Sequence, residues 1–388
     1  MFSVLLIIIS VSLAPVHRGL DPQARSDEAR RLFAEARDAA SRSDWTAAER
    51  DYLLLLKVDP GWAEAIVNLG IVYNREGKTE EAIDAFKKAV EADPKLFGAR
   101  LNLGITYFRL HRFDDAEDPL KQATIIDPQS DQAARLLIMT LFARNKFAEV
   151  ASMAGKLLGA APDDPALLEI AGRAYLNQRE YPDALKALEA RAKLQPENAE
   201  IYQLLGEARD NVNDSEGALR EFRHAIALLG GTPLADIHFD SGYVLWKLRR
   251  YEEARVEFEL ELKGNPNHLA SVYYLGNIAL SRNDIATALP LLERAAQAMP
   301  ESFAARYDLG KALVRSEAIA RAEQELRTAI TLNPKISGAH YELAIVLKKL
   351  GRQEEADREL KIARDLNQEE RVDLERKVQG EENKKRAP

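Results

Sequence analysis

Apolar and small side chains recur along this chain at fixed positions of a 34-residue frame. In the second repeat of the frame, Leu69, Gly70 and Tyr73 stand at positions seven, eight and eleven, and Ala82 and Phe86 stand at positions twenty and twenty-four. Residues three or four apart share one face of a helix. Each repeat is therefore predicted to form two amphipathic helices, with a turn between positions 14 and 17.

The prolines set the register of this frame. Eight of them are spaced by the repeat length within two runs: Pro60, Pro94, Pro128, Pro162 and Pro196, then Pro266, Pro300 and Pro334. Proline disfavours a helical conformation of the residue before it, so each one is expected to mark the end of a second helix. Only the sixth of the ten repeats has a different length, by two residues. The repeats are 29–62, 63–96, 97–130, 131–164, 165–198, 199–234, 235–268, 269–302, 303–336 and 337–370.

Small residues occupy two of the recurring positions. Glycine stands at position eight in seven repeats, and alanine stands at position twenty in nine of the ten. Because glycine inside a helix costs about 1 kcal/mol relative to alanine, its recurrence indicates a close approach of another helix. We expect the glycine of the first helix to face the alanine of the second.

These residues resemble the tetratricopeptide repeat family. The segment IVNLGIVYNREGKTEEAIDAFKKAVEADP, residues 66–94, is similar to that repeat at almost every position, and the resemblance covers residues 29–370. The predicted fold class is all-α, and the resemblance implies a right-handed α-solenoid superhelix of tandem helix-turn-helix repeats. A single repeat is too short to fold alone, so neighbouring repeats must stack to bury a continuous core.

Two repeats depart from the pattern. The fourth has Ile138 at position eight and Ala154 at position twenty-four, so its large side chain is on the first helix and its small one on the second. Because the total volume is similar, we expect this repeat to fold. The sixth ends with Gly230-Gly231, which predicts a hinge or a neutral loop insertion. The predicted organisation is a leader, two arrays and a cap: 1–24, 25–230, 231–370 and 371–388, the last being the end of a capping helix and a charged tail.

The first residues form an apolar run that ends before Arg18. Residues 2–13, FSVLLIIISVSL, contain no charge, and their length matches the core of a signal peptide, which is about 7–15 residues, better than a membrane span of about 20. We expect export to the periplasm or the exterior, or a membrane tether, in a bacterial cell. A buried strand, an uncleaved interfacial anchor and a cytoplasmic location are the alternatives.

Composition narrows the chemistry. The formal net charge of -8 provides no basic field, so nucleic acid is not expected as a partner. The chain has no cysteine and only six histidines, which lack the pairing of a helical metal site. No G-x-S-x-G elbow, P-loop, dinucleotide fingerprint or H-E-x-x-H occurs. We therefore predict no enzyme, no cofactor, no metal and no catalytic residue.

The family resemblance implies that positions 2, 5, 6, 9, 12 and 13 of each repeat face a groove. Position five of the last four repeats, with two neighbours on the first of these helices, is predicted to form an aromatic ladder for apolar side chains of a peptide. Aromatic residues at this position can instead pack between helices. The candidate residues are Phe239, Tyr243, Trp246, Tyr273, Tyr307 and Tyr341.

Polar candidates complete the predicted groove. Position thirteen is basic in five repeats, where cations could bind acidic segments or could simply favour the C-terminal end of the first helix. Asn68 and Asn102 at position six resemble two rungs of the asparagine ladder that holds peptide backbones in some members of the family. The basic residues are Arg75, Arg109, Lys247, Arg315 and Lys349.

The combined pattern predicts a non-enzymatic scaffold or adaptor that binds a protein or peptide in the groove of a tetratricopeptide superhelix. A membrane-tethered envelope-assembly factor is an alternative, in which only the N-terminal segment would contact the membrane. A substrate-selecting subunit of a glycosyltransferase system is a further, less favoured alternative.

Overall fold

The computed structural model describes residues 26–386, in which the chain forms twenty α-helices and no strand. The predicted signal segment, residues 1–24, lies outside the described residues. The helices are α1 (Asp27–Ser41), α2 (Trp45–Val58), α3 (Ala63–Glu76), α4 (Thr79–Ala92), α5 (Phe97–Arg109), α6 (Phe113–Ile126), α7 (Asp131–Ala143), α8 (Phe147–Ala160), α9 (Pro165–Asn177), α10 (Tyr181–Leu194), α11 (Ala199–Asn211), α12 (Ser215–Leu229), α13 (Ile237–Lys247), α14 (Tyr251–Gly264), α15 (Leu269–Ser281), α16 (Ile285–Ala298), α17 (Phe303–Arg315), α18 (Ile319–Leu332), α19 (Ser337–Lys349) and α20 (Gln353–Arg386).

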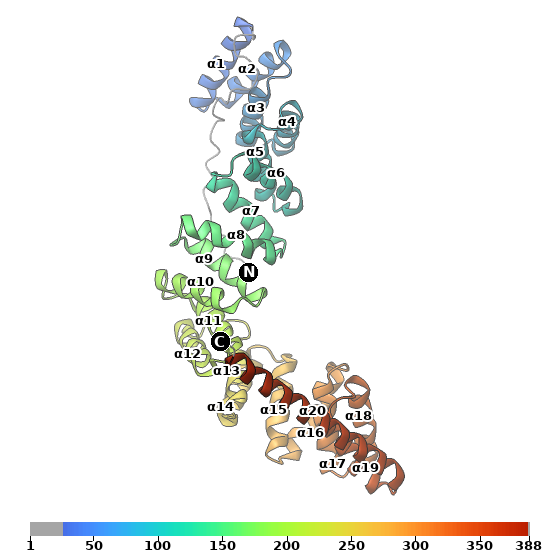
Figure 1. Ribbon diagram of the computed structural model, residues 1–388. Coiled ribbons are helices and arrows are strands. Elements are labelled where there is room, and N and C mark those ends of the chain that lie inside the picture. Colours follow the sequence, from blue (N-terminus) through green and yellow to red (C-terminus); the bar gives the residue numbers. More distant parts are fainter. Residues whose placement is uncertain (1–25, 387–388) are drawn as a thin grey trace. The chain divides into compact units, whose positions relative to one another are not determined.

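The helices pair as the frame predicts, two to a repeat. The two helices of each repeat pack together, as α3 does on α4 and α15 on α16, and the pairs stack in chain order within residues 26–196 and within residues 197–386 (Figure 1). First helices of neighbouring repeats also touch, for example α3 with α5 and α15 with α17. This all-α solenoid confirms the predicted fold class, and the first helices line the side on which neighbouring repeats approach each other.

The chain divides into two compact parts, one ending at Pro196 and the other beginning at Glu197. The loop at Gly230 and Gly231 lies inside the second part, where both glycines have positive φ angles of 54° and 95°. One hydrophobic cluster contains residues from both sides of this loop, including Phe222 and Ile237. The predicted hinge at this loop stays a prediction.

The turns between paired helices share one backbone conformation. Position fifteen has a left-handed φ in all ten repeats, yet only Gly77 and Gly351 are glycine there. The following N–H donates to a carbonyl near the end of the first helix, as Lys78 does to Tyr73 at 2.9 Å. This bond closes the helix end in the manner of a Schellman motif and reverses the chain within the predicted turn. The other residues at this position are Ser43, His111, Asn145, Arg179, Asn213, Arg249, Asn283 and Glu317.

The recurring glycines make room for a large side chain and not for alanine, which corrects our expectation. A Cβ atom built on Gly70 would lie 2.6 Å from the ring of Phe86, and one on Gly104 would lie 2.6 Å from Leu120. Both neighbours stand at position twenty-four and are fully buried. In these two repeats the side chain of the second helix thus inserts directly against the backbone of the first, and a larger residue at Gly70 or Gly104 would collide with it.

The fourth repeat folds as expected, with Ile138 and Ala154 both buried between α7 and α8. In other repeats a large side chain at position twenty-four fills the space between the helices, and here Ile138 at position eight fills it. At the C-terminus, α20 runs through Arg386, so the capping helix continues through the residues where we expected a charged tail.

Candidate partner-binding surface

The structure brings five aromatic residues of α13 and α15 together on the first-helix side of repeats seven and eight. Phe239, Tyr243 and Trp246 follow one face of α13 at spacings of four and three residues, and their consecutive ring centroids are 6.2 Å apart. Tyr274 contacts the Tyr243 ring at 5.6 Å and the Trp246 ring at 5.0 Å. Tyr273 contacts Tyr274 at 5.1 Å. We call these five residues the aromatic wall, and all of them are half-buried.

The two remaining ladder residues do not join this cluster through any ring contact among the described residues. Tyr307 on α17 stacks on Phe303 at 5.5 Å, and Tyr341 on α19 is 53% exposed. The ladder is therefore continuous over repeats seven and eight and is followed by two separate aromatic positions. Sequence reasoning missed Tyr274, because position six was considered only as a place for asparagine.

Hydrogen bonds hold the aromatic wall in place. The Trp246 indole N–H donates to Asn277 Oδ1 at 2.9 Å, and Asn277 Nδ2 donates to Asp308 Oδ2 at 2.7 Å. The Tyr273 hydroxyl donates to the same Asp308 oxygen at 2.9 Å, and Lys311 Nζ lies 3.1 Å from the other. Asp308 is only 4% exposed. Burial, and then the charge of this carboxylate, raise the pKa of Tyr273, so its hydroxyl stays protonated as the donor.

These contacts join three consecutive repeats through groups on their first helices. A buried carboxylate with three donors is well satisfied, and its network limits the rotamers that Trp246 and Tyr273 can adopt. Aromatic side chains that are ordered before binding lose little entropy when a partner packs on them. The wall thus has the properties of a preorganised binding surface.

Two of the five predicted basic residues already bind groups of the protein. Lys247 Nζ pairs with Asp210 Oδ1 at 2.6 Å, and Arg315 donates to the carbonyl of Leu280 at 2.6 Å. Arg75, whose guanidinium lies 5.9 Å from the Trp45 ring centroid, is exposed, and so are Arg109 and Lys349. The five residues therefore do not act as one basic stripe, and Lys247 and Arg315 bind across the junction between neighbouring repeats.

The predicted asparagine pair is not presented to a partner in this structure. Asn68 is 1% exposed and Asn102 is 6% exposed. The Asn102 amide donates to the carbonyl of Gly98 in its own helix at 2.8 Å. Because a backbone ladder requires accessible amides, these two residues give no support to it.

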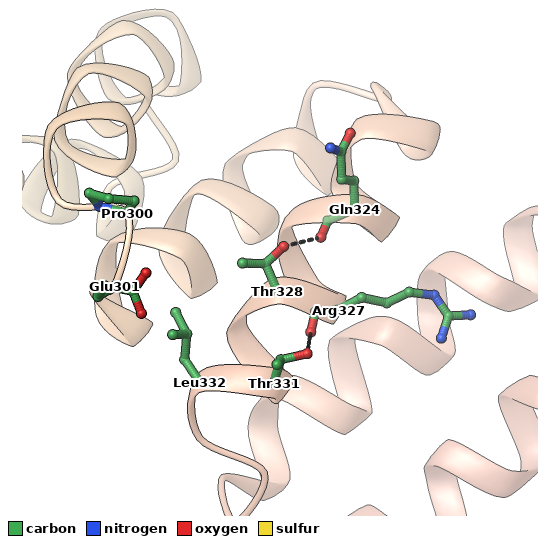
Figure 2. A pocket seen from close by; sticks show the side chains of 7 residues that line it. All are labelled: Pro300, Glu301, Gln324, Arg327, Thr328, Thr331 and Leu332. Atoms are coloured by element: carbon green, nitrogen blue, oxygen red, sulfur yellow. Dashed lines mark hydrogen bonds between the residues drawn. The ribbon is translucent and has the colours of Figure 1, made fainter.

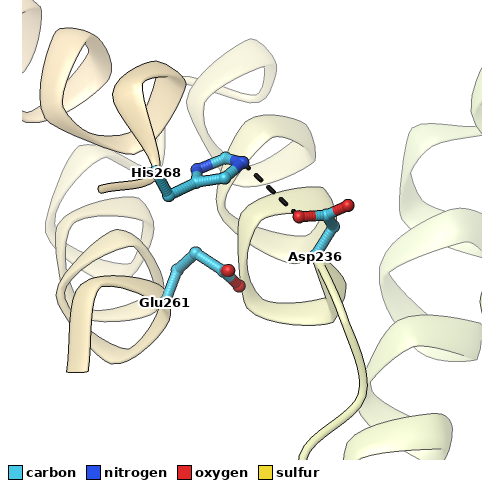
Figure 3. Close-up of side chains that lie close together, drawn as sticks. All are labelled: Asp236, Glu261 and His268. Carbon is cyan, nitrogen blue, oxygen red and sulfur yellow. Dashed lines mark ion pairs between the residues drawn. The ribbon is translucent and has the colours of Figure 1, made fainter. Parts of the chain in front are cut away.

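An acidic cluster lies beside the aromatic wall, and sequence reasoning missed it. Figure 3 shows Asp236, at the N-cap of α13, Glu261 near the end of α14 and His268 at the N-cap of α15, with ligand atoms that all lie within 4.8 Å of one another. His268 Nε2 is 3.5 Å from Asp236 Oδ1, and Glu261 Oε2 accepts the backbone N–H of Phe239 at 3.3 Å. Three separate elements supply these groups, so no local spacing reveals them.

The tautomer of His268 decides what this cluster can hold. The backbone N–H of Ser271 donates to His268 Nδ1 at 3.2 Å, which caps α15. An accepting Nδ1 places the proton of the neutral ring on Nε2, the nitrogen that faces Asp236. The three residues could therefore ligate a metal through Nε2 only after the ring changes its tautomer.

A hollow of about 500 Å³ lies between α18 and the turn that joins α16 to α17. Figure 2 shows Thr328 and Thr331 on its wall, and their hydroxyls donate to carbonyls of their own helix at 2.9 Å. Arg327, also on the wall, pairs with Glu323 and Glu355. The two hydroxyls and the guanidinium are thus occupied within the protein and do not converge on the space as the polar groups of an active site do.

Models of known protein families match the repeats of this chain. A family model described as the cilia and flagella-associated protein 70 C-terminal domain matches residues 20–238, more than half of the chain, and a tetratricopeptide repeat model matches residues 279–335. This chain belongs to the tetratricopeptide repeat family. These matches confirm the resemblance inferred from residues 66–94. Tetratricopeptide repeat folds typically bind protein or peptide partners.

Individual relatives of this tetratricopeptide repeat protein are similar over limited regions. The BBSome complex member BBS4 of Bos taurus is 31% identical over 106 residues, which are 27% of this chain and 20% of BBS4. The chain thus aligns with about a fifth of that relative's length.

Solved structures show similar repeats at low identity. The complex of Naa15/Naa10 bound to HypK-THB has a TM-score of 0.47 and 19% identity, covering 89% of this chain and 64% of that one. YrrB, described as a TPR protein with an unusual peptide-binding site, has a TM-score of 0.42 and 23% identity, covering 50% of this chain and 100% of its own. Neither similarity extends to a ligand or an activity of this chain.

Within residues 26–386, none of the tetratricopeptide helices combines the length and the apolar character that a membrane crossing requires.

Proposed function

We propose that this protein is a non-enzymatic scaffold that binds a segment of another protein on the aromatic wall of repeats seven and eight. The observation that carries the proposal is the wall itself: five ring-bearing side chains lie in mutual contact, half-buried, and the Trp246 and Tyr273 side chains are fixed by the network on Asp308. Tyrosine and tryptophan held in this way are the residues that most often dominate the energy of protein interfaces.

The chemistry of the surface supports binding over catalysis. The Tyr273 hydroxyl and the Asp308 carboxylate could each serve as an acid or base, but each is bonded to the other inside the network. The groups that remain accessible on the wall are aromatic faces, which bury apolar side chains of a partner and perform no proton transfer.

Two aromatic substitutions test the proposal. Tyr243→Ala and Tyr274→Ala remove two half-buried rings of the wall, one from α13 and one from α15, and neither hydroxyl belongs to the Asp308 network. The full chain and this double variant are used as baits for capture from the native organism, followed by mass spectrometry. We expect at least one partner of the unmodified chain to be lost by the double variant.

Val256→Ala is the matched control, because Val256 is an exposed apolar residue on the second helix of repeat seven. It should retain every partner. Equal retention by the double variant would place the interface elsewhere, and circular dichroism of all three proteins separates loss of binding from loss of folding.

We also propose that residues 1–24 export this scaffold or tether it to a membrane. The support is the uncharged run FSVLLIIISVSL at residues 2–13. Mass spectrometry of the mature N-terminus from native cells tests it, and an intact Met1 in the soluble cytoplasmic fraction would contradict it.

A further inference from the structure

One end of the aromatic wall is acidic. Asp236 and Asp240 stand four residues apart at the start of α13, beside Phe239 and one turn before Tyr243. Glu261, which is 7% exposed, brings a third carboxylate against the backbone of Phe239. Rings and carboxylates thus alternate along the first turns of this helix.

The protein's own lysines show what such an arrangement binds. Lys311 Nζ lies 5.0 Å from the ring centroid of Tyr307 and 3.1 Å from Asp308 Oδ1. Lys247 Nζ lies 5.8 Å from the ring centroid of Tyr243 and 2.6 Å from Asp210 Oδ1. At two places on the first-helix side, an ammonium group is therefore held between a tyrosine face and a carboxylate.

The start of α13 has the same components without the cation. Asp240 Oδ2 accepts a hydrogen bond from the neutral amide of Gln203 at 2.8 Å, and no lysine or arginine of the described residues pairs with it. Asp236 faces His268, which is charged only when protonated. The carboxylates at this end of the wall therefore carry negative charge that is not balanced by a permanent cation.

The proton affinity of Asp240 agrees with this picture. Burial is the largest cause that raises its pKa to about 6, and repulsion from Asp236, Glu207 and Glu261 adds to it, while the hydrogen bond from Gln203 acts in the opposite direction. A raised carboxyl pKa means that the ionised form lacks stabilising partners. A cation placed beside it would supply them.

We propose that this end of the aromatic wall receives a lysine or arginine side chain of the bound partner, with the cation held between the rings of Phe239 and Tyr243 and the carboxylates of Asp236 and Asp240. This inference rests on the proposed function and names the chemistry of its partner: a basic segment whose neighbouring side chains are apolar. It differs from the acidic partner that a basic stripe would select, because Lys247 and Arg315 are already bound within the protein.

Selection from a random peptide library tests the inference before any partner has been identified. Twelve-residue peptides displayed on phage are selected on the full chain, and the enriched peptides are synthesised and titrated. We expect enrichment of lysine or arginine next to leucine, phenylalanine or tyrosine. We further expect the double variant Asp236→Asn/Asp240→Asn to bind the same peptides about tenfold more weakly.

The two asparagines keep the structure while removing charge. Asparagine tolerates the left-handed conformation of Asp236, at φ 62°, and its side-chain oxygen can still accept the hydrogen bond from Gln203. The control Glu301→Gln/Glu354→Gln removes two exposed charges elsewhere in the same part of the chain, one in the turn before α17 and one on α20. It should bind the peptides as tightly as the unmodified protein does.

The outcomes separate this inference from the function on which it rests. Selected peptides that are neutral or acidic, or that bind the Asp236→Asn/Asp240→Asn variant equally well, overturn the inference; if they still lose affinity with Tyr243→Ala, the aromatic wall remains a binding surface. Peptides that are indifferent to Tyr243→Ala, or a selection that yields no binder, count against both.

Discussion

Glu317 occupies the left-handed position in the turn between α17 and α18, at φ 63°. An L side chain in this conformation costs about 1–2 kcal/mol relative to glycine, while glycine gives back about 0.5–1 kcal/mol through the greater freedom of the unfolded chain. Because the strain of the L residue exceeds the entropic cost of glycine, glycine is the more stable residue at this position. Glu317→Gly should therefore raise the free energy of unfolding by about 0.5–1 kcal/mol, measured by urea denaturation.

Gly351 provides the reciprocal control, since it has φ 76° at the same position of the last repeat and nothing lies near its Cβ position. Gly351→Ala should lower the free energy of unfolding by a similar amount, because the strain then appears without any steric clash. A Glu317→Gly protein that is less stable than the unmodified chain would mean that the Glu317 side chain makes a stabilising contact in solution.

For single residues, the sequence predicted the helix on which each candidate binding residue lies. It did not predict which groups that residue contacts. The 34-residue frame and the family resemblance placed Phe239, Tyr273 and Arg315 on the first helices, where the structure has them. Their partners follow from side-chain rotamers and from the spacing between repeats. Neither the contact of Arg315 with a carbonyl nor the Asp308 network could therefore be derived from a periodic pattern.

Within a repeat, the packing of Gly104 on α5 against Leu120 on α6 sets how closely the two helices approach. A Cβ atom on Gly104 would lie 2.6 Å from two atoms of Leu120, so Gly104→Ala forces the leucine or the backbone to move. Overpacking of this kind costs about 1–3 kcal/mol, against a gain of about 1 kcal/mol in helix propensity. We expect the free energy of unfolding to fall by about 1–2 kcal/mol, measured by urea denaturation.

A double-mutant cycle isolates this contact. In a Leu120→Ala background the space is open, so Gly104→Ala should become stabilising. Gly159→Ala on α8 is the matched control, because nothing lies within 4 Å of its Cβ position, and it should gain up to about 1 kcal/mol. If Gly104→Ala stabilises the unmodified chain as much as Gly159→Ala does, the close approach of α5 and α6 is wrong.

The helices and their turns could be predicted because amphipathic periodicity is a property of local sequence. All ten pairs form with their turns where the frame places them, including the fourth repeat with its exchanged bulk. The partner of each glycine was predicted wrongly, because periodicity identifies the face of a helix and not the side chain opposite it. In these pairs position twenty-four, and not position twenty, fills the space next to the glycine.

Over the whole molecule, contacts are local in sequence. Within residues 26–196 and within residues 197–386, consecutive helices pack on each other, and several first helices also pack on the first helix of the next repeat, as α3 does on α5 and α15 on α17. The stability of such an array is approximately a sum of the stabilities of its repeats and of the interfaces between neighbours. A substitution that destabilises one repeat should therefore also lower the stability of the adjacent repeats and leave that of distant repeats unchanged.

Leu188→Ala tests this independence, because Leu188 on α10 is fully buried against Gly172 and its loss should cost about 2–5 kcal/mol. Hydrogen exchange followed by mass spectrometry should show faster exchange in α9 and α10 and unchanged protection in α17 and α18. Leu326→Ala, the equivalent change on α18, removes the side chain that packs against Gly310 and should show the reverse pattern. If both substitutions instead lower protection equally in α9 and α17, the array opens as one cooperative body, and partner binding on the aromatic wall would then stabilise every repeat of the chain.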